Sequence, residues 1–497
     1  MDLNGFRNKL DDTDNEMIRL FIRRMKIIEE IAAYKSRNDI SVRDAERERT
    51  VIERLCSLTD EKYHDYIKTL YGAVFECGRT YQANLIRGAE KRFGLVGEDL
   101  SHSYSKIIHG MFGEYDYELL SLPRGEIEDF ILRGKYDGLN VTIPYKKTVY
   151  PLCGELSETA SNTGSVNTVI KQSDGIIKGF NTDYKGFKEM IERSGIDVRN
   201  KYAVVLGGGG TSSTVQAYLK DRKAKIVRVV SRSGEYNYAN LNIHKECEIL
   251  INATPVGMYP NNETAPVSLS DFPNCSAVID VIYNPLRTDL LIQANKKKIP
   301  NAGGLYMLLA QAKESYAIFT GNKISEERLN DIYDMLVKSV ENIVLIGMPG
   351  CGKTAVGKLV SERLDRPFVD IDGVTAEKFN MTIPEIFGKY GEEKFREYES
   401  ETIKEYGKQK GLVISTGGGA VLREENRRAL MWNGKIYYID RSVEKLAVEN
   451  RPLSIDTDNL KKMYEYRKKF YEEAAGKIID NNTEPESAAD EIVKDFK

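Results

Sequence analysis

The spacing of hydrophobic positions changes twice along the chain. From Asp2 to about Arg87, apolar residues recur every three or four positions with no proline and hardly a glycine, which predicts amphipathic helices. From Phe93, short apolar runs (FGLVG, YAVVLGGGG, IVRVVS, CEILINAT) alternate with helical stretches, as is typical of a parallel α/β sheet. After an amphipathic helix over Ser325–Lys338, a strand opens at Ile343 and a second α/β alternation runs to the end. The pattern predicts a multi-domain chain, with an all-α part followed by two α/β parts.

Boundaries between these parts are expected near Arg92 and Glu341. No Gly/Ser-rich or Pro-rich linker separates the parts, so we expect them to be held close together. The division gives a three-helix domain over residues 1–91, a middle α/β region over 92–340 and a second α/β domain over 341–497.

Composition supports three packed domains and excludes several classes of protein. The chain has 497 residues, of which 41% are hydrophobic and 30% charged, so it is neither disordered nor collagen-like. Lys plus Arg number 72 and Asp plus Glu 75, and this balance gives no reason to expect nucleic-acid binding. No apolar run is long enough for a membrane span, and the first 35 residues are charged and amphipathic, unlike a signal peptide. Six scattered cysteines without a CxxC pair predict a reducing, cytoplasmic location and no disulfide or zinc site.

The first helical pattern, from Leu3 to Lys35, is long for so small a domain. As one helix it would extend about 50 Å, so it can bury its apolar stripe only in a long bundle or against another chain. Arg24 and Lys35 are about three turns apart and share a face, whereas Arg7 lies about 100° away around the axis. The simplest interpretation is a dimerising bundle with a solvated charged face.

The amino-acid identities in this helical part favour a catalytic interpretation. The segment FRNKLDDTDNEMIRLFIRRMKIIEEIAAYK, followed by VRDAERE, resembles the all-helical chorismate mutase family over nearly its whole length. The resemblance implies a homodimer in which Arg7 comes from the partner subunit, and it places these residues in the pocket: Arg7, Arg24, Lys35, Asp44, Arg47, Glu48 and Gln82. One departure is Gly78, where the family often has a small hydroxyl residue.

These residue types suit the rearrangement of chorismate to prephenate. The reaction is intramolecular, so the protein needs only to clamp a dicarboxylate in its folded conformer and to stabilise charge on the ether oxygen. Arginines bind carboxylates in a bidentate manner. On the resemblance, Lys35 and Gln82 face the ether oxygen and Glu48 binds the ring hydroxyl.

The middle region contains a candidate dinucleotide turn. The loop GGGGTSS, with Gly207, Gly209 and Gly210, follows the strand YAVVL and precedes a helix. The next strand, IVRVV, ends in Ser231, Arg232 and Ser233 where an NAD-binding protein has an acidic residue. An arginine flanked by hydroxyl groups favours the 2′-phosphate of NADP(H).

Several motifs of the middle region occur in the order seen in shikimate dehydrogenases. They are VGEDLSHSYSKIIH, NVTIPYK, GSVNTV, NTD, NATPVGM and GGLYMLLAQA. The resemblance covers Phe93 to about Lys338 and implies a substrate part over 92–190 plus the C-terminal helices, and a Rossmann-type NADP-binding part over 191–305. By type alone, Lys146 and Asp183 are ordinary surface charges. The resemblance makes them an acid–base pair for reducing 3-dehydroshikimate, with Lys146 acting as the acid or as an electrostatic clamp.

The same resemblance assigns further substrate and cofactor contacts. Ser103 and Ser105 would hold the substrate carboxylate. The ring oxygens would be bound by Thr142, Lys146, Asn167, Asp183 and Gln311, with Tyr283 as a neighbour and Gly304 beside the cofactor.

The C-terminal part opens with a complete phosphate-binding loop. The sequence GMPGCGKT, with Gly347, Gly350, Gly352, Lys353 and Thr354, follows the strand NIVLI directly. Its backbone N–H groups cradle the phosphates of ATP, Lys353 reaches the transferred phosphoryl group and Thr354 ligates Mg²⁺.

Five further motifs indicate which molecule accepts the phosphoryl group. They are VDIDG, FREYES, STGGGA, RPLS and EYRKKFYEE, and together they resemble shikimate kinase from Asn342 onward. On that resemblance Asp370 supports Mg²⁺, Asp372 accepts the proton of the substrate hydroxyl and Arg451 is the lid arginine. The carboxylate and ring would be held by Arg396, Arg467, Gly417, Gly418 and Gly419.

The sequence as a whole predicts a trifunctional enzyme that acts on chorismate, 3-dehydroshikimate and shikimate, three cyclic carboxylates. One alternative keeps the helices as a catalytically silent dimerisation or sensing module beside a bifunctional dehydrogenase and kinase. Another is an NAD-preferring quinate dehydrogenase, which the stretch Ser231-Arg232-Ser233 disfavours. A third is a gluconate or nucleotide kinase, which Arg396, Arg467 and the GGG loop disfavour.

Overall fold

The computed structural model describes residues 3–37, 44–87, 92–172, 175–446 and 457–497. These residues belong to two compact units, Met1–Pro123 with Arg133–Asn140, and Arg124–Leu132 with Val141–Lys497. None of the helices within the described residues is both long enough and apolar enough to span a bilayer.

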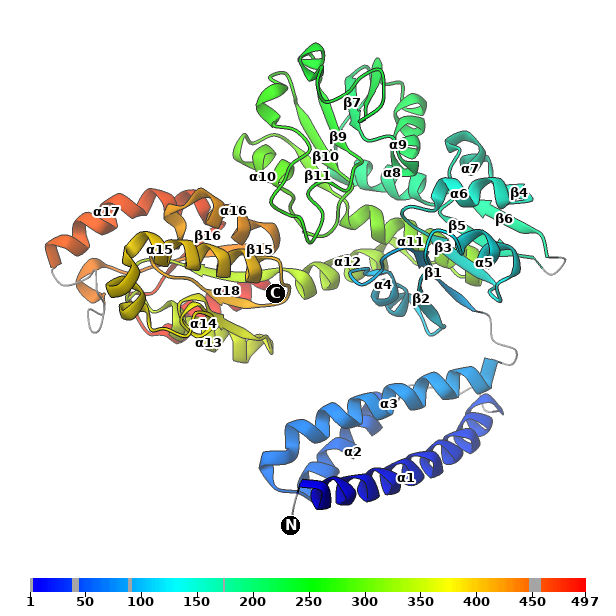
Figure 1. The fold of residues 1–497 in the computed structure, drawn as a ribbon, viewed down its shortest axis with the longest axis horizontal. Coiled ribbons are helices and arrows are strands. Elements are labelled where there is room, and N and C mark those ends of the chain that lie inside the picture. The colour runs from blue at the N-terminus through cyan, green and yellow to red at the C-terminus, as the bar shows by residue number, and fades with distance from the viewer. Residues whose placement is uncertain (1–2, 38–43, 88–91, 173–174, 447–456) are drawn as a thin grey trace. The chain divides into compact units, whose positions relative to one another are not determined.

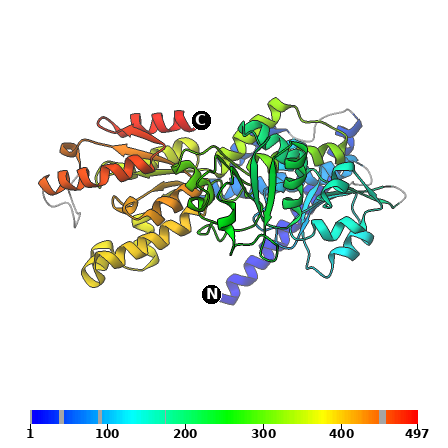
Figure 2. The same ribbon diagram turned by 90° about the horizontal axis from the view of Figure 1, so that it is seen from above.

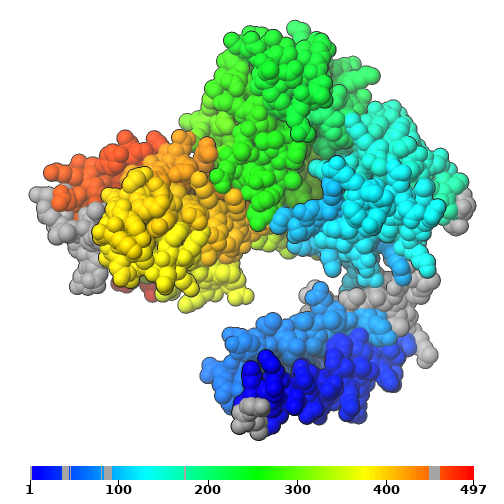
Figure 3. All heavy atoms as spheres, viewed as in Figure 1, coloured from blue at the N-terminus to red at the C-terminus, as the bar shows by residue number. Residues whose placement is uncertain are grey.

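The predicted N-terminal helices are present. They are α1 (Leu3–Arg37), α2 (Ala45–Ser57) and α3 (His64–Arg87). The 35 residues of α1 form one uninterrupted helix, as Figures 1 and 2 show. At a rise of about 1.5 Å per residue this helix is about 52 Å long. Ile28 and Ala32 are buried where α1 packs on α3, but most of its apolar side chains are exposed, and α1 lies open on the face seen in Figure 3.

The first unit also contains the start of the middle region. Its strand β1 (Phe93–Gly97) is buried throughout and pairs in parallel with β2 (Tyr117–Ser121). Between them, α4 (Ser105–Phe112) buries Ile108 and Phe112. The strand β3 (Gly138–Val141) is also fully buried.

The second unit opens with short elements of the predicted substrate part. They are α5 (Ile127–Arg133), α6 (Lys146–Val149), β4 (Glu155–Leu156), α7 (Glu158–Thr163), β5 (Thr168–Lys171), β6 (Ile177–Phe180) and α8 (Asp183–Ser194). β5 runs antiparallel to β6, and β4 runs parallel to it. This hairpin brings Asn167, just before β5, beside Phe180 at the end of β6, and α8 begins three residues after that strand.

The predicted Rossmann-type sheet has five parallel strands in the order β11-β10-β9-β7-β8. Its elements are β7 (Tyr202–Leu206), α9 (Gly210–Asp221), β8 (Ile226–Val230), β9 (Ile249–Asn252), β10 (Ala277–Asp280), α10 (Asp289–Lys296) and β11 (Asn301–Gly303). Because β8 and β9 flank β7 on opposite sides, the strand order reverses at β7. Ligands of such sheets bind at the carboxyl ends of the strands beside this reversal, and the glycine turn lies there.

Two helices follow this sheet, α11 (Leu305–Thr320) and α12 (Glu326–Val340). α11 packs closely along α8, since a Cβ at Gly186 would lie 2.6 Å from the backbone oxygen of Met307. α11, one of the helices that the sequence assigns to the substrate part, therefore lies against α8.

The C-terminal sheet also has five parallel strands, in the order β13-β14-β12-β15-β16. The strands are β12 (Asn342–Ile346), β13 (Phe368–Asp370), β14 (Val413–Ser415), β15 (Gly434–Asp440) and β16 (Lys477–Asp480). The helices are α13 (Lys353–Leu364), α14 (Ile371–Lys378), α15 (Ile383–Gly407), α16 (Glu424–Asn433), α17 (Thr457–Ala474) and α18 (Pro485–Phe496). The phosphate-binding loop follows β12, the central and fully buried strand.

Candidate active sites

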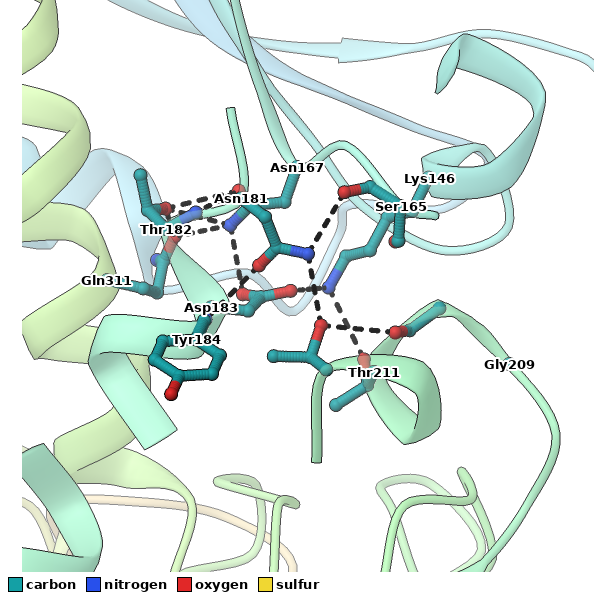
Figure 4. A network of polar contacts seen from close by, with 12 residues as sticks. Lys146, Ser165, Asn167, Asn181, Thr182, Asp183, Tyr184, Gly209, Thr211 and Gln311 are labelled. Atoms are coloured by element: carbon teal, nitrogen blue, oxygen red, sulfur yellow. Dashed lines mark hydrogen bonds and ion pairs between the residues drawn. The ribbon is translucent and has the colours of Figure 1, made fainter. Parts of the chain in front are cut away.

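Lys146 and Asp183 form the centre of the candidate site in the middle region. The ammonium Nζ of Lys146 lies 2.5 Å from Oδ2 of Asp183, and both side chains are largely buried. Lys146 begins α6 and Asp183 begins α8, so both stand on helix starts rather than on long loops. Lys146 Nζ also donates to the Thr211 hydroxyl at 3.4 Å (Figure 4). The pair can hold and move a proton beside the glycine turn.

Asn167 and Gln311 join this centre through buried amides. Asn167 Nδ2 donates to Asp183 Oδ1 at 2.9 Å and to Gln311 Oε1 at 3.4 Å. Thr182 completes the cluster, since its N–H donates to Asn167 Oδ1 at 2.7 Å. Figure 4 shows these side chains pointing toward one another from three separate elements. Gln311 reaches the cluster only because α11 packs on α8.

The glycine turn approaches this centre closely. A Cβ at Gly210 would lie 2.6 Å from Ser165 Oγ and 3.1 Å from Lys146 Cβ, so only glycine fits there. Gly207 has φ +110°, and a Cβ at this position would lie 2.9 Å from the Ala253 oxygen. The turn can therefore present backbone N–H groups to a pyrophosphate directly beside Lys146.

The stretch Ser231-Arg232-Ser233 stands where β8 ends, at the carboxyl edge of the sheet. The Ser231 N–H donates to the Tyr236 oxygen at 3.0 Å, which turns the chain back, and Arg232 is exposed. This stretch carries no acidic side chain that would repel a 2′-phosphate. These residues and the glycine turn fit NADP(H).

The other predicted residues of the middle region lie on loops and helix starts. In the first unit Ser105 begins α4, and its N–H donates to Ser103 Oγ at 3.2 Å. In the second unit the Thr142 oxygen accepts from Tyr145 N, which closes the turn before α6. Tyr283 follows β10, and Gly304 precedes α11.

The phosphate-binding loop is held by its own lysine. Lys353 Nζ donates to the backbone oxygens of Gly347 and Met348 at 3.0 and 2.9 Å. Thr354 Oγ1 donates a hydrogen bond to Asp370 Oδ2 at 3.0 Å, so two oxygen atoms that can ligate a metal ion lie side by side. Two oxygens and bound phosphates are the ligands that Mg²⁺ prefers, so this donor set fits ATP with Mg²⁺. Gly350 and Gly352 both have positive φ.

The GGG loop brings the acceptor residues together by close backbone approach. A Cβ at Gly417 would lie 2.6 Å from Asp372 Oδ1, and one at Gly418 would lie 2.5 Å from Pro349 Cδ in the phosphate-binding loop. At Gly419 it would lie 2.2 Å from Arg396 Nη2. The loop thus lies against the predicted base, the phosphate loop and a predicted carboxylate clamp.

Two buried arginines lie near the GGG loop. Arg467 Nη1 donates to the Gly418 oxygen at 3.1 Å, and Arg396 Nη1 donates to Glu399 Oε2 at 2.7 Å. Burial raises the pKa of the Glu399 carboxyl to about 7, while Arg396 lowers it and Asp372 raises it. A buried acid beside Asp372 favours a protonated Glu399, with Arg396 left able to bind an anion.

In the helical part, Arg24 and Gln82 occupy the groove between α1 and α3. Arg24 Nη1 donates to the Val74 oxygen at 3.5 Å, and a Cβ at Gly78 would lie 3.2 Å from the same nitrogen. Gly78 therefore leaves space for the Arg24 guanidinium where a larger residue would crowd it. Gln82 Oε1 is buried without a hydrogen-bond partner among the described residues.

The remaining mutase-type residues lie on α1, on α2 or just before α2. Glu48 accepts from Arg79 at 2.5 Å, and Asp44 accepts from Arg47 N at 2.9 Å. Asp44 is thus the N-cap of α2, so the structure gives it a local role that the sequence did not predict. Arg7 and Arg47 are exposed, and Lys35 is half-buried. Arg451 lies outside the described residues.

Several residues that support these sites were given no role in the sequence analysis, although most of them lie within the motifs quoted there. They are Asn181, Thr182, Asn252 and Asp280 in the middle region and Glu399, Tyr471 and Asn481 in the C-terminal part. Glu399 had a usable signal, since it stands three residues after Arg396 on a helix. Asn481 donates to the Cys351 oxygen from a segment far along the chain, which no local pattern could indicate.

In the middle region the Lys146–Asp183 pair lies against the dinucleotide turn, which is the arrangement of a dinucleotide-dependent dehydrogenase. The C-terminal part has the phosphate-binding loop and parallel sheet of a P-loop kinase. Comparison with known proteins identifies the family of each part. Three family models match in order: chorismate mutase type II over residues 6–83, the shikimate dehydrogenase substrate binding domain over 95–169 and shikimate kinase over 349–497.

Curated relatives match the middle of the chain over nearly their full length. A shikimate dehydrogenase (NADP(+)) of Clostridium perfringens is 36% identical over 269 residues, which is 50% of this chain and 98% of the relative. One of Methanosphaera stadtmanae is 33% identical over 273 residues, covering 49% of this chain and 96% of the relative. The middle region therefore belongs to the shikimate dehydrogenase family, and chorismate mutase and shikimate kinase domains flank it.

Two solved structures match the same half of the chain, each 36% identical. Shikimate dehydrogenase 1 of Peptoclostridium difficile aligns with a TM-score of 0.47 and covers 50% of this chain and 97% of its own. A chorismate mutase/shikimate 5-dehydrogenase fusion protein of Clostridium acetobutylicum aligns with a TM-score of 0.46 and the same coverage.

Proposed function

We propose that the chain is a trifunctional enzyme, with a mutase domain over 1–91, a dehydrogenase over 92–340 and a kinase over 341–497. It converts chorismate to prephenate, reduces 3-dehydroshikimate to shikimate with NADPH, and phosphorylates shikimate with ATP. The observation that carries the proposal is the contact of Lys146 with both Asp183 and the dinucleotide turn. The acid–base pair and the cofactor turn meet there at one point.

In the dehydrogenase, Lys146 donates a proton to the oxygen that becomes a hydroxyl group. NADP(H), when bound by the glycine turn and Arg232, supplies the hydride. Asp183 holds the lysine ammonium in place, and Asn167 and Gln311 orient the ring hydroxyls. Thr142 and Tyr283 complete the ring contacts, while Ser103 and Ser105 bind the substrate carboxylate.

In the kinase, Asp372 accepts the proton of the attacking hydroxyl group, and Arg396 with Arg467 binds the shikimate carboxylate. ATP with Mg²⁺ supplies the phosphoryl group, with the metal held by Thr354 and Asp370. Lys353 leaves its backbone acceptors to stabilise the transferring phosphate. Glu399 aims the Arg396 guanidinium. By the resemblance to shikimate kinase, Arg451 stabilises the transferring phosphoryl group.

In the mutase domain, Gln82 and Lys35 stabilise the ether oxygen, and Arg24, Arg47 and the partner's Arg7 bind the two carboxylates. The buried, unpartnered Gln82 oxygen supports a polar ligand in the groove. Along α1, Leu3, Phe6 and Leu10 are 65%, 54% and 63% exposed, which supports burial of this helix in a homodimer.

We also propose a cytoplasmic location, which the six free cysteines support.

One preparation of the full chain tests all three activities. It is assayed separately with chorismate, with 3-dehydroshikimate plus NADPH, and with shikimate plus ATP and Mg²⁺. We expect turnover in each assay. Turnover in only the last two would make the helical part a silent dimerisation module, and reduction with NADH in preference to NADPH would contradict the cofactor assignment.

A further inference from the structure

The segment after β10 is bound to the kinase part through Arg287. Arg287 Nε donates to the Met431 oxygen at 2.9 Å, and Nη2 donates to the Gly434 oxygen at 2.7 Å and to Glu341 Oε1 at 2.9 Å. Both backbone oxygens belong to the junction between α16 and β15. One side chain thus satisfies two carbonyl groups and one carboxylate of the kinase part.

Backbone and helix contacts extend this junction. The N–H groups of Leu286 and Arg287 donate to Asn433 Oδ1 and to the Trp432 oxygen at 3.0 and 2.9 Å. Trp432, only 1% exposed, donates its indole N–H to Asp289 Oδ1 at 3.0 Å. Ile292 of α10 is buried within the hydrophobic core of the kinase sheet. The two parts therefore share a core, with buried polar contacts of defined geometry.

A second loop of the dehydrogenase meets the kinase in the same way. Glu263, in the loop that follows β9, lies 3.6 Å from Nζ of Lys404 in α15 and 3.3 Å from Nζ of Lys408 just after this helix. Both loops, after β9 and after β10, leave the carboxyl ends of their strands. That edge is where a parallel α/β sheet binds its ligands.

The kinase presents its opposite edge. Glu341 precedes β12 and Gly434 begins β15, and these strands start in register, with Asn342 opposite Gly434. The phosphate-binding loop leaves the carboxyl end of β12, beyond Ile346. The junction thus joins the ligand-binding edge of the dehydrogenase sheet to the edge of the kinase sheet that carries no substrate residue.

Short contacts connect the junction to the dehydrogenase site. The Gly304 N–H donates to the Ile282 oxygen at 2.9 Å, and a Cβ at Gly304 would lie 2.0 Å from the Val281 oxygen. The segment that Arg287 anchors therefore lies directly against Gly304, which starts the helix carrying Gln311.

A second route reaches the glycine turn. Thr288 Oγ1 donates to Asp280 Oδ2 at 2.7 Å, and Asn252 Nδ2 donates to the same carboxylate at 3.1 Å. Asn252 Oδ1 in turn accepts from the Thr254 hydroxyl at 2.7 Å. The Thr254 methyl group would touch a Cβ at Gly207, at 3.0 Å.

We propose that the kinase part is a positioning scaffold for the dehydrogenase site, with Arg287 and Trp432 as positioning residues that act through the segment 281–288. The proposal rests on the dehydrogenase activity proposed above. The coupling is one-sided, because the junction touches the ligand edge of one sheet and the opposite edge of the other.

Kinetics of full-chain variants test this one-sidedness. Arg287→Met keeps the aliphatic stem and removes the guanidinium group, and Trp432→Phe removes only the indole donor from a still apolar side chain. Each is expected to raise the KM of the dehydrogenase for NADPH and 3-dehydroshikimate roughly three- to tenfold, with a smaller change in kcat. The kinase kcat/KM should stay within about twofold, since coupling to that edge is not expected. Arg199→Met, which removes an exposed arginine paired with Asp197, is the matched control and should change neither reaction.

Two kinetic outcomes overturn the proposal. Equal losses in both reactions would show a general loss of stability, and unchanged dehydrogenase parameters would show a passive junction. A wild-type chain that does not reduce 3-dehydroshikimate would instead refute the proposed function itself, so the two failures are distinguishable.

Trp432 is the single tryptophan of the chain, so its emission reports on the junction without labelling. NADP⁺ binds the dehydrogenase part, and a ligand raises the unfolding midpoint of whatever is coupled to its site. We expect saturating NADP⁺ to raise the thermal midpoint followed by Trp432 emission, and we expect Arg287→Met to reduce this shift by at least half. If NADP⁺ does not change the thermal midpoint of Trp432 emission in the wild-type chain, the coupling is contradicted.

Discussion

Lys146 is the proposed proton donor of the dehydrogenase. It contacts the Asp183 carboxylate and the Thr211 hydroxyl of the dinucleotide turn. Lys146→Ala removes the proposed proton donor and its ion pair with Asp183. We expect reduction of 3-dehydroshikimate to fall by at least about 100-fold, while phosphorylation of shikimate stays near the wild-type rate. Assays of both reactions on one preparation check this, and a parallel loss of both would show that the two parts do not work independently.

Arg232 is expected to decide between the two nicotinamide cofactors. It is exposed at the end of β8, in a stretch without an acidic residue. Arg232→Asp removes the attraction for a 2′-phosphate and offers a carboxylate to the ribose hydroxyl groups, so the preference for NADPH over NADH should invert. The ratio of kcat/KM values for the two cofactors measures the effect. Arg199→Asp is the matched control, and an unchanged ratio in the Arg232 variant would contradict this assignment.

Glu399 gives the kinase a pH-dependent stability. Burial raises the pKa of this carboxyl from 4.5 to about 7 in the folded chain, so between these pH values the folded state holds a proton that the unfolded state lacks. The free energy of unfolding must therefore fall as the pH rises through this window, because ionising Glu399 costs free energy in the folded state.

Glu399→Gln removes this titration. Relative to wild type, its melting temperature should be higher at pH 8 than at pH 5.5, with a difference on the order of a few degrees. Thermal unfolding at both pH values measures it. Glu401→Gln, an exposed neighbour on α15, should show no such trend, and a Glu399→Gln difference that is the same at both pH values would refute the assignment.

At the scale of elements, the close approach of the GGG loop to α15 makes a steric prediction. A Cβ at Gly419 would lie 2.2 Å from the Arg396 guanidinium, which is buried and paired with Glu399. Gly419→Ala should therefore displace this arginine and raise the KM for shikimate roughly tenfold or more, with the KM for ATP little changed.

Gly388 of α15 offers a control glycine outside the GGG loop. A Cβ there has nothing within 4 Å, so Gly388→Ala should leave the kinase parameters unchanged and stabilise α15 by about 0.5–1 kcal/mol. Steady-state kinetics of the two variants side by side separate a steric effect at the loop from a general effect of alanine. Equal KM values for shikimate in both would show that Arg396 does not bind it.

The elements that a local pattern defines were predictable from the sequence. The periodic apolar residues of α1 predicted one long helix because side chains three and four apart share a face. The glycine turns after β7 and β12 were predictable because their backbone conformations and close approaches require glycine. One local role was missed: the Asp44 side chain caps α2 from the position just before the helix, whereas the sequence placed Asp44 only in the pocket.

Contacts that depend on packing were beyond the sequence. Trp432 and Asp289 are 143 positions apart, and only the docking of α16 on α10 brings them together. The spacing of Glu399 from Arg396 was a local signal, but its approach to the GGG loop and Asp372 depends on the packing of that loop against α15. Such residues are recognised when the position of one element relative to another is known, and a local pattern does not contain that information.

At the scale of the whole molecule, the geometry of α1 supports the proposed mutase dimer. Arg24 is half-buried and directed toward α3, where it donates to the Val74 oxygen, whereas Arg7 is exposed. The helix is about 52 Å long and exposes much of its apolar surface. Pairing of two chains through α1 would bury that surface and bring Arg7 of one chain to the Arg24 groove of the other.

Mixing inactive variants tests this arrangement. Arg7→Ala and Arg24→Ala should each abolish mutase activity in homodimers, because every site then lacks one carboxylate partner. In a heterodimer one site carries both lesions and the other carries none. Random exchange of equal amounts makes about half of the dimers mixed, so about a quarter of all sites should recover. The regained prephenate formation measures this recovery.

The matched control mixes Arg24→Ala with Lys35→Ala. These residues share one face of α1 and would serve the same site from the same chain, so each site of such a heterodimer keeps one lesion and no activity should return. Recovery in the first mixture and none in the control would establish a site built from two chains. If heterodimers form and neither mixture recovers, the pocket lies within a single chain, and the exposed stripe of α1 must then be buried without contributing Arg7 to catalysis.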